Sequence, residues 1–256
     1  MHSAGLSSAP ISLSTILHRM IPPRNFALIP AAGIGARMGA EFPKQYLPLA
    51  GKPMLRHVLD TFAACSAIAH TFVVVSAEDG YIVDLIAAAP HLKDRVTLLY
   101  HGGESRHASV LNGLNAIRDL LADEDWVLVH DAARPNLSRD DLDKLLFELA
   151  DDTVGGLLAV PARDTLKRAD KHGRVLETVD RTPIWQAYTP QMFRLGALHR
   201  ALADSLVSDV VITDEASAME WAGHAPRLIE GRSDNLKVTR PEDLEWLRQR
   251  RTFQSS

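Results

Sequence analysis

The 256-residue sequence lacks several features that would assign it to a protein class at once. Cys65 is its only cysteine, which excludes an intramolecular disulfide and a cysteine-based zinc site and predicts a buried, unreactive thiol. No apolar run approaches the roughly 20 residues that a membrane-spanning helix needs, so no membrane partner is expected. The 28 Lys and Arg residues are balanced by 32 Asp and Glu, which predicts no general affinity for nucleic acid. Any phosphate site must therefore be local.

Common catalytic signatures are missing as well. The 11 histidines show no HExxH or other paired metal-ligand spacing, and no GxSxG nucleophile motif occurs. Residues 1–24 are rich in Ser, Ala and Pro but lack the basic start and long apolar stretch of a secretory signal. We expect these residues to form a flexible N-terminal tail, and we expect a cytoplasmic enzyme.

From residue 25 onward, strand-like apolar runs alternate with helix-like segments. The expected strands are 25–30, 71–76, 96–100, 126–130, 155–160 and 227–230. The expected helices are 54–65, 79–89, 105–121, 139–150, 195–204, 214–222 and 241–251. This alternation predicts one α/β domain over residues 25–251, with a Rossmann-like, mostly parallel sheet that is flanked by helices on both faces.

The alternation breaks at about residues 161–183. Two short strands, 165–169 and 174–179, are joined by the turn-like sequence Asp-Lys-His-Gly, which indicates a hairpin. The hairpin is too polar for a core element, so we expect it to project as an arm. An isolated hairpin is marginally stable in water, so a second subunit is its expected packing partner and the protein is expected to be a homodimer.

The stretch LIPAAGIGARMG, residues 28–39, follows the first strand and indicates a phosphate-binding loop. Its glycines do not match the GxGxxG dinucleotide motif, and Gly51-Lys52 is followed by Pro53 rather than the Ser or Thr of an ATPase loop. A tight turn would explain the glycines alone. The nearby Arg37 and Lys44 favour a polyphosphate instead.

Three further clusters contain candidate ligand-binding residues. His101–Arg106 follows a strand and opens a helix, which a simple cap by Ser105 would also explain. Asp131 and Arg134 follow an apolar strand, where they could bind Mg²⁺, a ribose or a phosphate, or form an ion pair that braces the loop. Lys237 precedes the last helix and is not needed to cap it.

Taken together, these clusters resemble the 2-C-methyl-D-erythritol 4-phosphate cytidylyltransferases of the non-mevalonate isoprenoid pathway. The matching stretches occur in the family's order and cover nearly all of residues 25–250. They are IPAAGIGARMG, FPKQYLPLAGKPML, HGGESRHASVLNGL, VHDAARP, ARDTLKR, VDRTPIWQAYTPQMF, ITDEASAMEWAG and GRSDNLKVTRPEDL. The resemblance implies CMP transfer from CTP to methylerythritol phosphate, with release of pyrophosphate.

The resemblance also implies a role for each matching residue. The catalytic cations would be Arg37, Lys44 and Lys237. Nucleotide binding would involve Ala31, Ala32, Gly33, Gly103, Ser109 and Asp131, and substrate binding would involve Arg134, Thr165, Arg181, Thr189 and Thr213. The arm of a family member reaches into its neighbour's active site, so Thr165 and Arg181 would act in trans. Mg²⁺ would be held mostly by nucleotide phosphates, with Asp131 as a possible ligand.

Glu104 stands where other family members have the shorter Asp, which leaves the base or ribose contact at that position open. The N-terminal tail has no family counterpart. A related enzyme, ribitol 5-phosphate cytidylyltransferase, and a regulator that binds CTP without turnover are the alternatives. The combination of Arg37, Lys44 and Lys237 argues against the regulator, because ground-state binding needs less charge at the α-phosphorus.

Overall fold

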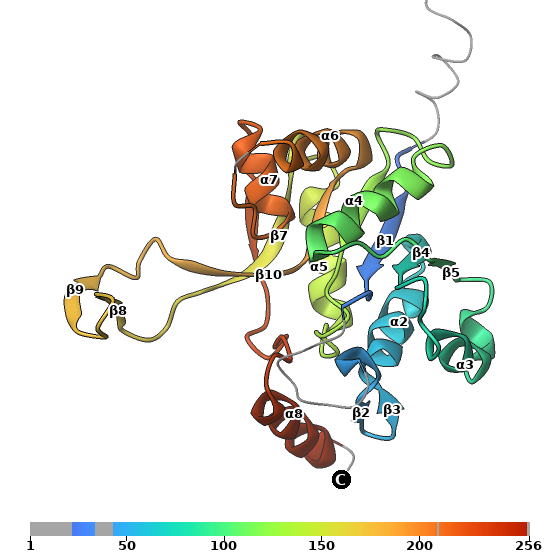
Figure 1. Ribbon diagram of the computed structural model, residues 1–256, viewed down its shortest axis with the longest axis horizontal. Coiled ribbons are helices and arrows are strands. Elements are labelled where there is room, and N and C mark those ends of the chain that lie inside the picture. Colours follow the sequence, from blue (N-terminus) through green and yellow to red (C-terminus); the bar gives the residue numbers. More distant parts are fainter. Residues whose placement is uncertain (1–21, 34–42, 209, 255–256) are drawn as a thin grey trace, which may run out of the picture.

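The computed structural model of the protein describes residues 22–33, 43–208 and 210–254 (Figure 1). Its centre is a seven-stranded sheet with the order β11-β7-β10-β6-β1-β4-β5. These strands are β11 (Arg227–Glu230), β7 (Gly155–Pro161), β10 (Trp185–Arg194), β6 (Trp126–Val129), β1 (Asn25–Pro30), β4 (Ile68–Val74) and β5 (Val96–Leu99). Among these seven strands, as far as the structure describes the chain, only β10 runs antiparallel to its neighbours. The predicted α/β class with a mostly parallel sheet is confirmed.

The inner strand β1 is apolar and buried from Phe26 to Ile29, because helices cover both faces of the sheet. Leu28 lies opposite Val129 of β6 and Phe72 of β4. Alternate β1 side chains enter two different cores: Leu28 packs with one cluster and Ile29 with the other. This burial on both faces is the reason that the strands read as continuous apolar runs in the sequence.

The helices divide into two layers (Figure 1). One core contains side chains of α2 (Met54–Ala64), α3 (Ile82–Ala87) and α5 (Arg139–Leu149). The other contains side chains of α4 (Arg106–Ile117), α6 (Leu195–Leu206) and α7 (Glu215–Trp221). Cys65 is buried in the first core, as expected. Among the described residues, no helix is long and apolar enough to cross a membrane.

A third, smaller apolar cluster packs the last helix against residues 49–54. It joins Leu49, Met54, Val238, Leu244 and Leu247. These residues come from β2 (Pro48–Leu49), α2, the segment before α8, and α8 itself (Pro241–Gln254). The short 3-10 helix η2 (Lys44–Tyr46) and β3 (Lys52–Pro53) flank this cluster, and a second 3-10 helix, η3 (Pro90–Leu92), follows α3. The cluster therefore brings the segment after residue 236 next to η2.

Some element boundaries differ from the sequence-based prediction. The strand predicted at 71–76 begins and ends earlier, as β4, and the helix predicted at 79–89 is shorter, as α3. The largest difference is β10, which the sequence did not predict. It lies between β6 and β7 and is the one antiparallel strand of the central sheet in the part of the chain that the structure describes.

The predicted hairpin is present and projects from the body (Figure 1). It consists of β8 (Leu166–Ala169) and β9 (Val175–Val179), which pair antiparallel and form a sheet of their own. The turn between them is closed by the side chain of Asp170, which accepts hydrogen bonds from the amides of His172 and Arg174. Gly173 adopts a positive φ of 78° in this turn. The arm buries almost nothing within its own chain.

Candidate active site

A cavity of about 570 Å³ opens at the carboxyl ends of the parallel strands. Its walls come from the segments that follow β1, β5 and β6, together with η2 and the segment before α8. β4 and β5 lie on one side of β1 and β6 lies on the other. Ligands of open α/β sheets bind at such a reversal of strand order, because the loops diverge there and leave a crevice.

Eight of the residues that were expected to form the site line the cavity. They are Ala31, Ala32, Gly33, Lys44, Gly103, Ser109, Asp131 and Lys237. Arg37, the third expected cation, lies outside the described residues. The cavity wall therefore combines small residues from three segments with two lysines that are far apart in the sequence.

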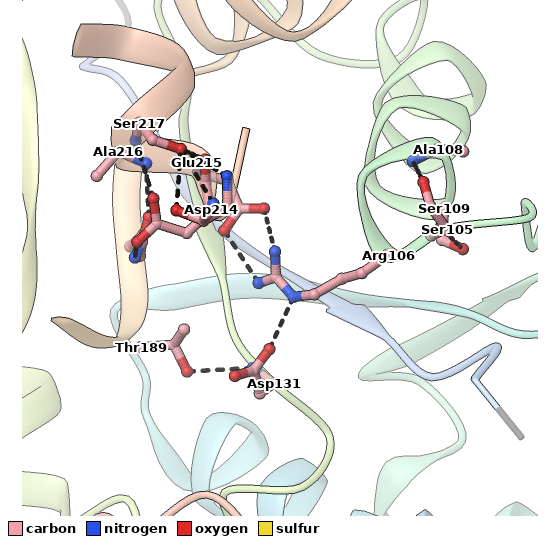
Figure 2. Close-up of polar contacts among 12 residues, drawn as sticks. Ser105, Arg106, Ala108, Ser109, Asp131, Thr189, Asp214, Glu215, Ala216 and Ser217 are labelled. Atoms are coloured by element: carbon pink, nitrogen blue, oxygen red, sulfur yellow. Dashed lines mark hydrogen bonds and ion pairs between the residues drawn. The ribbon is translucent and has the colours of Figure 1, made fainter. Parts of the chain in front are cut away.

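Asp131 is the electrostatic centre of the site (Figure 2). One carboxylate oxygen accepts from Arg106 Nε at 2.8 Å, and the other accepts from Lys237 Nζ at 2.9 Å. Arg134 Nε lies 3.4 Å from that second oxygen. Burial alone would raise the pKa of Asp131, but the three surrounding cations outweigh burial and hold it far below its usual range. Asp131 is therefore an anion at any physiological pH.

The two described lysines of the cavity are placed by packing as well as by charge. Lys44 Nζ donates to the carbonyl of Val238 at 3.1 Å, and the amide of Val238 donates to the carbonyl of Ala133 at 2.8 Å. Val238 is itself fixed in the third apolar cluster. This chain of contacts joins η2, the segment after β6 and the segment before α8, so it holds both lysines at the same opening.

The wall from Gly103 to Ser109 is tightly packed. Gly103 donates its amide to the Ser109 hydroxyl at 3.0 Å, and that hydroxyl donates to the carbonyl of Ser105 at 2.9 Å. A Cβ at Gly103 would lie 2.6 Å from the Cβ of Ala108, which is closer than two carbons can approach. Ser105 caps α4 by accepting from the amide of Ala108. Both alternatives for this segment thus hold: it is a helix cap, and it lines a cavity.

Behind Asp131 runs a buried hydrogen-bonded chain. The Asp131 amide donates to the Thr189 hydroxyl oxygen at 3.1 Å, and that hydroxyl lies 2.9 Å from His130 Nδ1. His130 Nε2 lies 3.1 Å from the carbonyl of Arg134. A carbonyl can only accept, so Nε2 carries the proton and Nδ1 accepts from Thr189. Burial lowers the pKa of His130 to about 4, which keeps the ring neutral.

Arg134 is held in this buried layer. Its guanidinium donates to the carbonyl of Asn235 at 2.8 Å and lies over the ring of Tyr188, 4.5 Å from its centroid. The expected ion pair between Asp131 and Arg134 is present. Neither Arg134 nor Thr189 lines the 570 Å³ cavity, and both are less than 10% exposed. In this chain alone they support the site from behind.

The remaining candidates lie away from the cavity. Thr165 and Arg181 are exposed at the two legs of the arm. Thr213 is exposed before α7, where its amide donates to the Ser217 hydroxyl at 3.0 Å. Asp214 and Ser217 form the capping box of α7. The structure thus groups the expected nucleotide-binding residues. Of the expected substrate-binding residues, Arg134 and Thr189 contact Asp131, while Thr165, Arg181 and Thr213 lie apart.

The match to a known family extends over most of the chain. Residues 26–248 match the family model described as IspD, 2-C-methyl-D-erythritol 4-phosphate cytidylyltransferase. The chain belongs to this cytidylyltransferase family. The predicted resemblance is therefore confirmed, and the protein is a nucleotidyltransferase.

Similar proteins support the same assignment. A 2-C-methyl-D-erythritol 4-phosphate cytidylyltransferase from Pseudomonas fluorescens Pf-5 is 69% identical over 229 residues, which cover 89% of this chain and 96% of that protein. One from Pseudomonas putida KT2440 is 66% identical over 231 residues, 90% and 97% of the two chains.

Solved structures also support the family assignment. A 4-diphosphocytidyl-2C-methyl-D-erythritol synthase is 43% identical, with a TM-score of 0.77 over 90% of this chain and 98% of that one. The Francisella tularensis cytidylyltransferase is 36% identical, with a TM-score of 0.71 over 87% and 97%.

Two charged residues of this cytidylyltransferase were given no role of their own by the sequence analysis. Arg106 lines the cavity, and Glu215 is completely buried beside it. They lie 109 residues apart in the sequence and meet only in the folded chain. Both fall inside matched stretches, HGGESRHASVLNGL and ITDEASAMEWAG, but capping by Ser105 and Asp214 was sufficient to explain the local pattern of each stretch.

Proposed function

We propose that this chain transfers CMP from CTP to 2-C-methyl-D-erythritol 4-phosphate, giving 4-CDP-2-C-methyl-D-erythritol and pyrophosphate. The observation that carries the proposal is family membership over residues 26–248, together with a cavity that gathers Lys44 and Lys237 at the carboxyl ends of the sheet. The relatives bear the name of this activity. The same membership favours this reaction over ribitol phosphate as substrate and over a non-catalytic CTP-binding regulator.

In the proposed reaction one anion attacks another. An oxygen of the substrate phosphate forms a bond to the α-phosphorus of CTP, and the bond from that phosphorus to the oxygen bridging to the β-phosphate breaks. Pyrophosphate then leaves in line with the attack. A phosphate monoester is already nucleophilic, so the protein's task is to position the two anions and to stabilise the developing charge. Lys44, Lys237 and Arg37 are proposed for that task.

We assign the nucleotide to the 570 Å³ cavity. The backbone of Ala31, Ala32 and Gly33 would lie along the triphosphate, and the wall formed by Gly103 and Ser109 would face the cytosine. The close packing around Gly103 supports selection of the smaller pyrimidine ring. Glu104 also lines the cavity and is one carbon longer than the Asp of other members, so it is a candidate for adjusting the base or ribose contact.

The side chains of the cavity can hold Mg²⁺ only together with the phosphate oxygens of a bound nucleotide. Both oxygens of Asp131 already accept from cationic side chains. Among the described residues, no group of three His, Cys, Asp or Glu side chains is placed to hold a metal ion. We propose that phosphate oxygens supply most of the ligands and that Asp131 is at most one of them. When bound, the ion would neutralise phosphate charge.

We further propose that the active unit is a homodimer in which each arm completes the partner's site. In support, Thr165 and Arg181 are exposed on an arm that buries almost nothing in its own chain. Arg134, Thr189 and Thr213 are proposed as substrate contacts in the completed site.

Subunit mixing tests the dimer. A mixed dimer of Lys44→Ala and Arg181→Ala subunits has one site with both defects and one intact site if the arm acts in trans, so mixing restores activity. If each arm serves its own subunit, both sites stay defective and mixing restores none.

Product formation tests the reaction. Purified protein with CTP, Mg²⁺ and methylerythritol phosphate should release pyrophosphate and form one CDP-polyol, identified by mass spectrometry. Ribitol 5-phosphate in place of methylerythritol phosphate should react far more slowly. Preference for ribitol phosphate, or CTP binding without pyrophosphate release, would overturn the assignment. The cytoplasm remains the expected location.

A further inference from the structure

The buried contact between Arg106 and Glu215 has no role in the reaction described so far. We propose that Glu215 is a positioning residue: by holding the end of Arg106, it fixes the orientation of the Asp131 carboxylate and thereby the place of Lys237. The inference rests on the proposed function, because it assigns Glu215 a part in the same phosphate chemistry. Figure 2 shows Arg106 reaching from the start of α4 toward both carboxylates.

Each nitrogen of Arg106 contacts one carboxylate oxygen. Nη1 and Nη2 donate to the two oxygens of Glu215 at 2.7 and 3.0 Å, a bidentate pair. Nε is the Arg106 nitrogen that contacts Asp131, and it donates to one carboxylate oxygen at 2.8 Å. The other oxygen of Asp131, which Arg106 does not contact, accepts from Lys237 at 2.9 Å, and Arg134 Nε lies 3.4 Å from it.

The charges around the pair reinforce this division. Glu215 has no exposed surface, and the Asp131 side chain is about 7% exposed. Burial would lower the pKa of Arg106, but the two carboxylates outweigh burial and raise it above its usual range. Without the charge on Glu215, the strongest partner left for the guanidinium is Asp131. If the two Nη atoms of Arg106 turned from Glu215 to Asp131, they would compete with Lys237 for the same carboxylate.

Hydrogen bonds of the residues on both sides of Glu215 fix its position. It is the first residue of α7, directly after the capping residue Asp214. Gln191 of β10 donates to the Asp214 carboxylate at 2.9 Å and accepts from the amide of Ala216 at 2.7 Å. The first turn of α7 is therefore tied to the central sheet on both sides of Glu215, and β10 also carries the Thr189 hydroxyl that binds the Asp131 amide.

The rival explanation is an ion pair that only stabilises the fold. The two explanations differ in their dependence on Lys237. A positioning role acts through Lys237, so the loss caused by Glu215→Gln should vanish once Lys237 is absent. A structural role is independent of Lys237, so the two losses should multiply.

The test is a double-mutant cycle on the full-length enzyme with CTP, Mg²⁺ and methylerythritol phosphate. We expect Glu215→Gln to lower kcat about 30-fold with the KM for CTP changed less than about threefold. In the Lys237→Ala background, the same substitution should lower kcat less than about threefold. Asp125→Asn is the matched control, because Asp125 is also buried and also holds an arginine, Arg24 at 2.9 Å, at the far end of β6. It should leave kcat unchanged.

If Glu215→Gln does not fold, the double variant Arg106→Met/Glu215→Met replaces it, since exchanging a whole buried ion pair for apolar side chains is usually tolerated. Unchanged kcat in the foldable variant overturns the inference, as does an equal loss in both backgrounds. A wild-type protein that releases no pyrophosphate would instead overturn the proposed function, so the two failures are distinguishable.

Discussion

The nucleotide cavity and the arm are built in opposite ways. The described lining residues of the cavity come from five segments of one chain, and Asp131 alone touches three cationic side chains. The arm is a two-stranded ribbon whose strands are almost entirely exposed. Yet the same family resemblance assigns residues of both regions to one reaction.

This contrast separates two kinds of functional residue. Cavity residues are held by their own chain, through buried bonds such as that from Arg106 to Asp131. Thr165 and Arg181 have no comparable support in this chain, because the legs of the arm lie in solvent. Arm residues must acquire a fixed position from another surface. The following predictions test this division, from the largest expected effect to the smallest.

The strongest test removes the arm. Pro161 pairs with Trp185, so a short Gly-Gly turn can replace residues 163–181 without moving the sheet. We expect a monomer whose turnover falls at least about 1000-fold, because the site loses the proposed substrate contacts of Thr165 and Arg181. Analytical ultracentrifugation and pyrophosphate release are the measurements. The body should keep its melting temperature to within a few degrees, and a fully active monomer would contradict the model in which the arm acts in trans.

The next test removes a cation from the cavity. We expect Lys44→Ala to lower turnover at least about 100-fold, by loss of charge stabilisation in the transition state. The same loss is expected for Arg37→Ala, on the basis of the family resemblance. Lys144→Ala is the control, since Lys144 also donates to a backbone carbonyl, that of Glu230 at 2.7 Å, but lies outside the cavity. A loss below tenfold for Lys44→Ala in a folded protein would remove Lys44 from the catalytic set.

A milder test changes the shape of the cavity wall. In Gly103→Ala the new methyl group would collide with Ala108, and relieving the collision must move the start of α4. We expect the KM for CTP to rise about tenfold with a smaller change in kcat, because ground-state and transition-state contacts to the base weaken together. Gly80→Ala is the control, because a Cβ at Gly80 meets no atom within 4 Å. An unchanged KM for Gly103→Ala would show that this wall does not contact the nucleotide.

The smallest expected effect concerns the buried layer behind the cavity. Burial lowers the pKa of His130 to about 4 in the folded protein, from about 6.5 in the unfolded chain. Between these values the unfolded chain binds more protons, so stability falls as the pH decreases from 6.5 to 4, by at most about 3 kcal/mol. Urea unfolding across this range measures the slope, and His130→Gln should reduce it. An identical slope in that variant would show that other groups cause the pH dependence.

Much of the fold could be predicted from the sequence because its strands are buried on both faces. β1 was predicted with its observed bounds, since an apolar run that ends in a glycine-rich loop has few other interpretations. β10 was missed for an equally physical reason. Its sequence, WQAYTPQMFR, neither alternates nor stays apolar, and Pro190 argues against an inner strand. Only its second half is buried.

The cavity residues could be predicted where a motif carried them, and the contacts that orient them could not. Lys44, Asp131 and Lys237 lie in stretches that match the family in order. The pairing of Arg106 with Glu215 depends on how α4 and α7 meet, and no local pattern encodes that meeting. The Asp131–Arg134 ion pair was foreseen because its partners are three residues apart.

β10 pairs with β7 at Trp185–Ala187 and again at Gln191–Phe193, and its register shifts in between. Thr189, which binds the Asp131 amide, lies within that shift. The first half of β10 continues the arm, and the second half adjoins the residue that supports the site. Each half is thus anchored to β7 separately. We expect the reach of the arm to be adjustable during evolution, by insertion near its tip, while the catalytic pocket keeps its geometry.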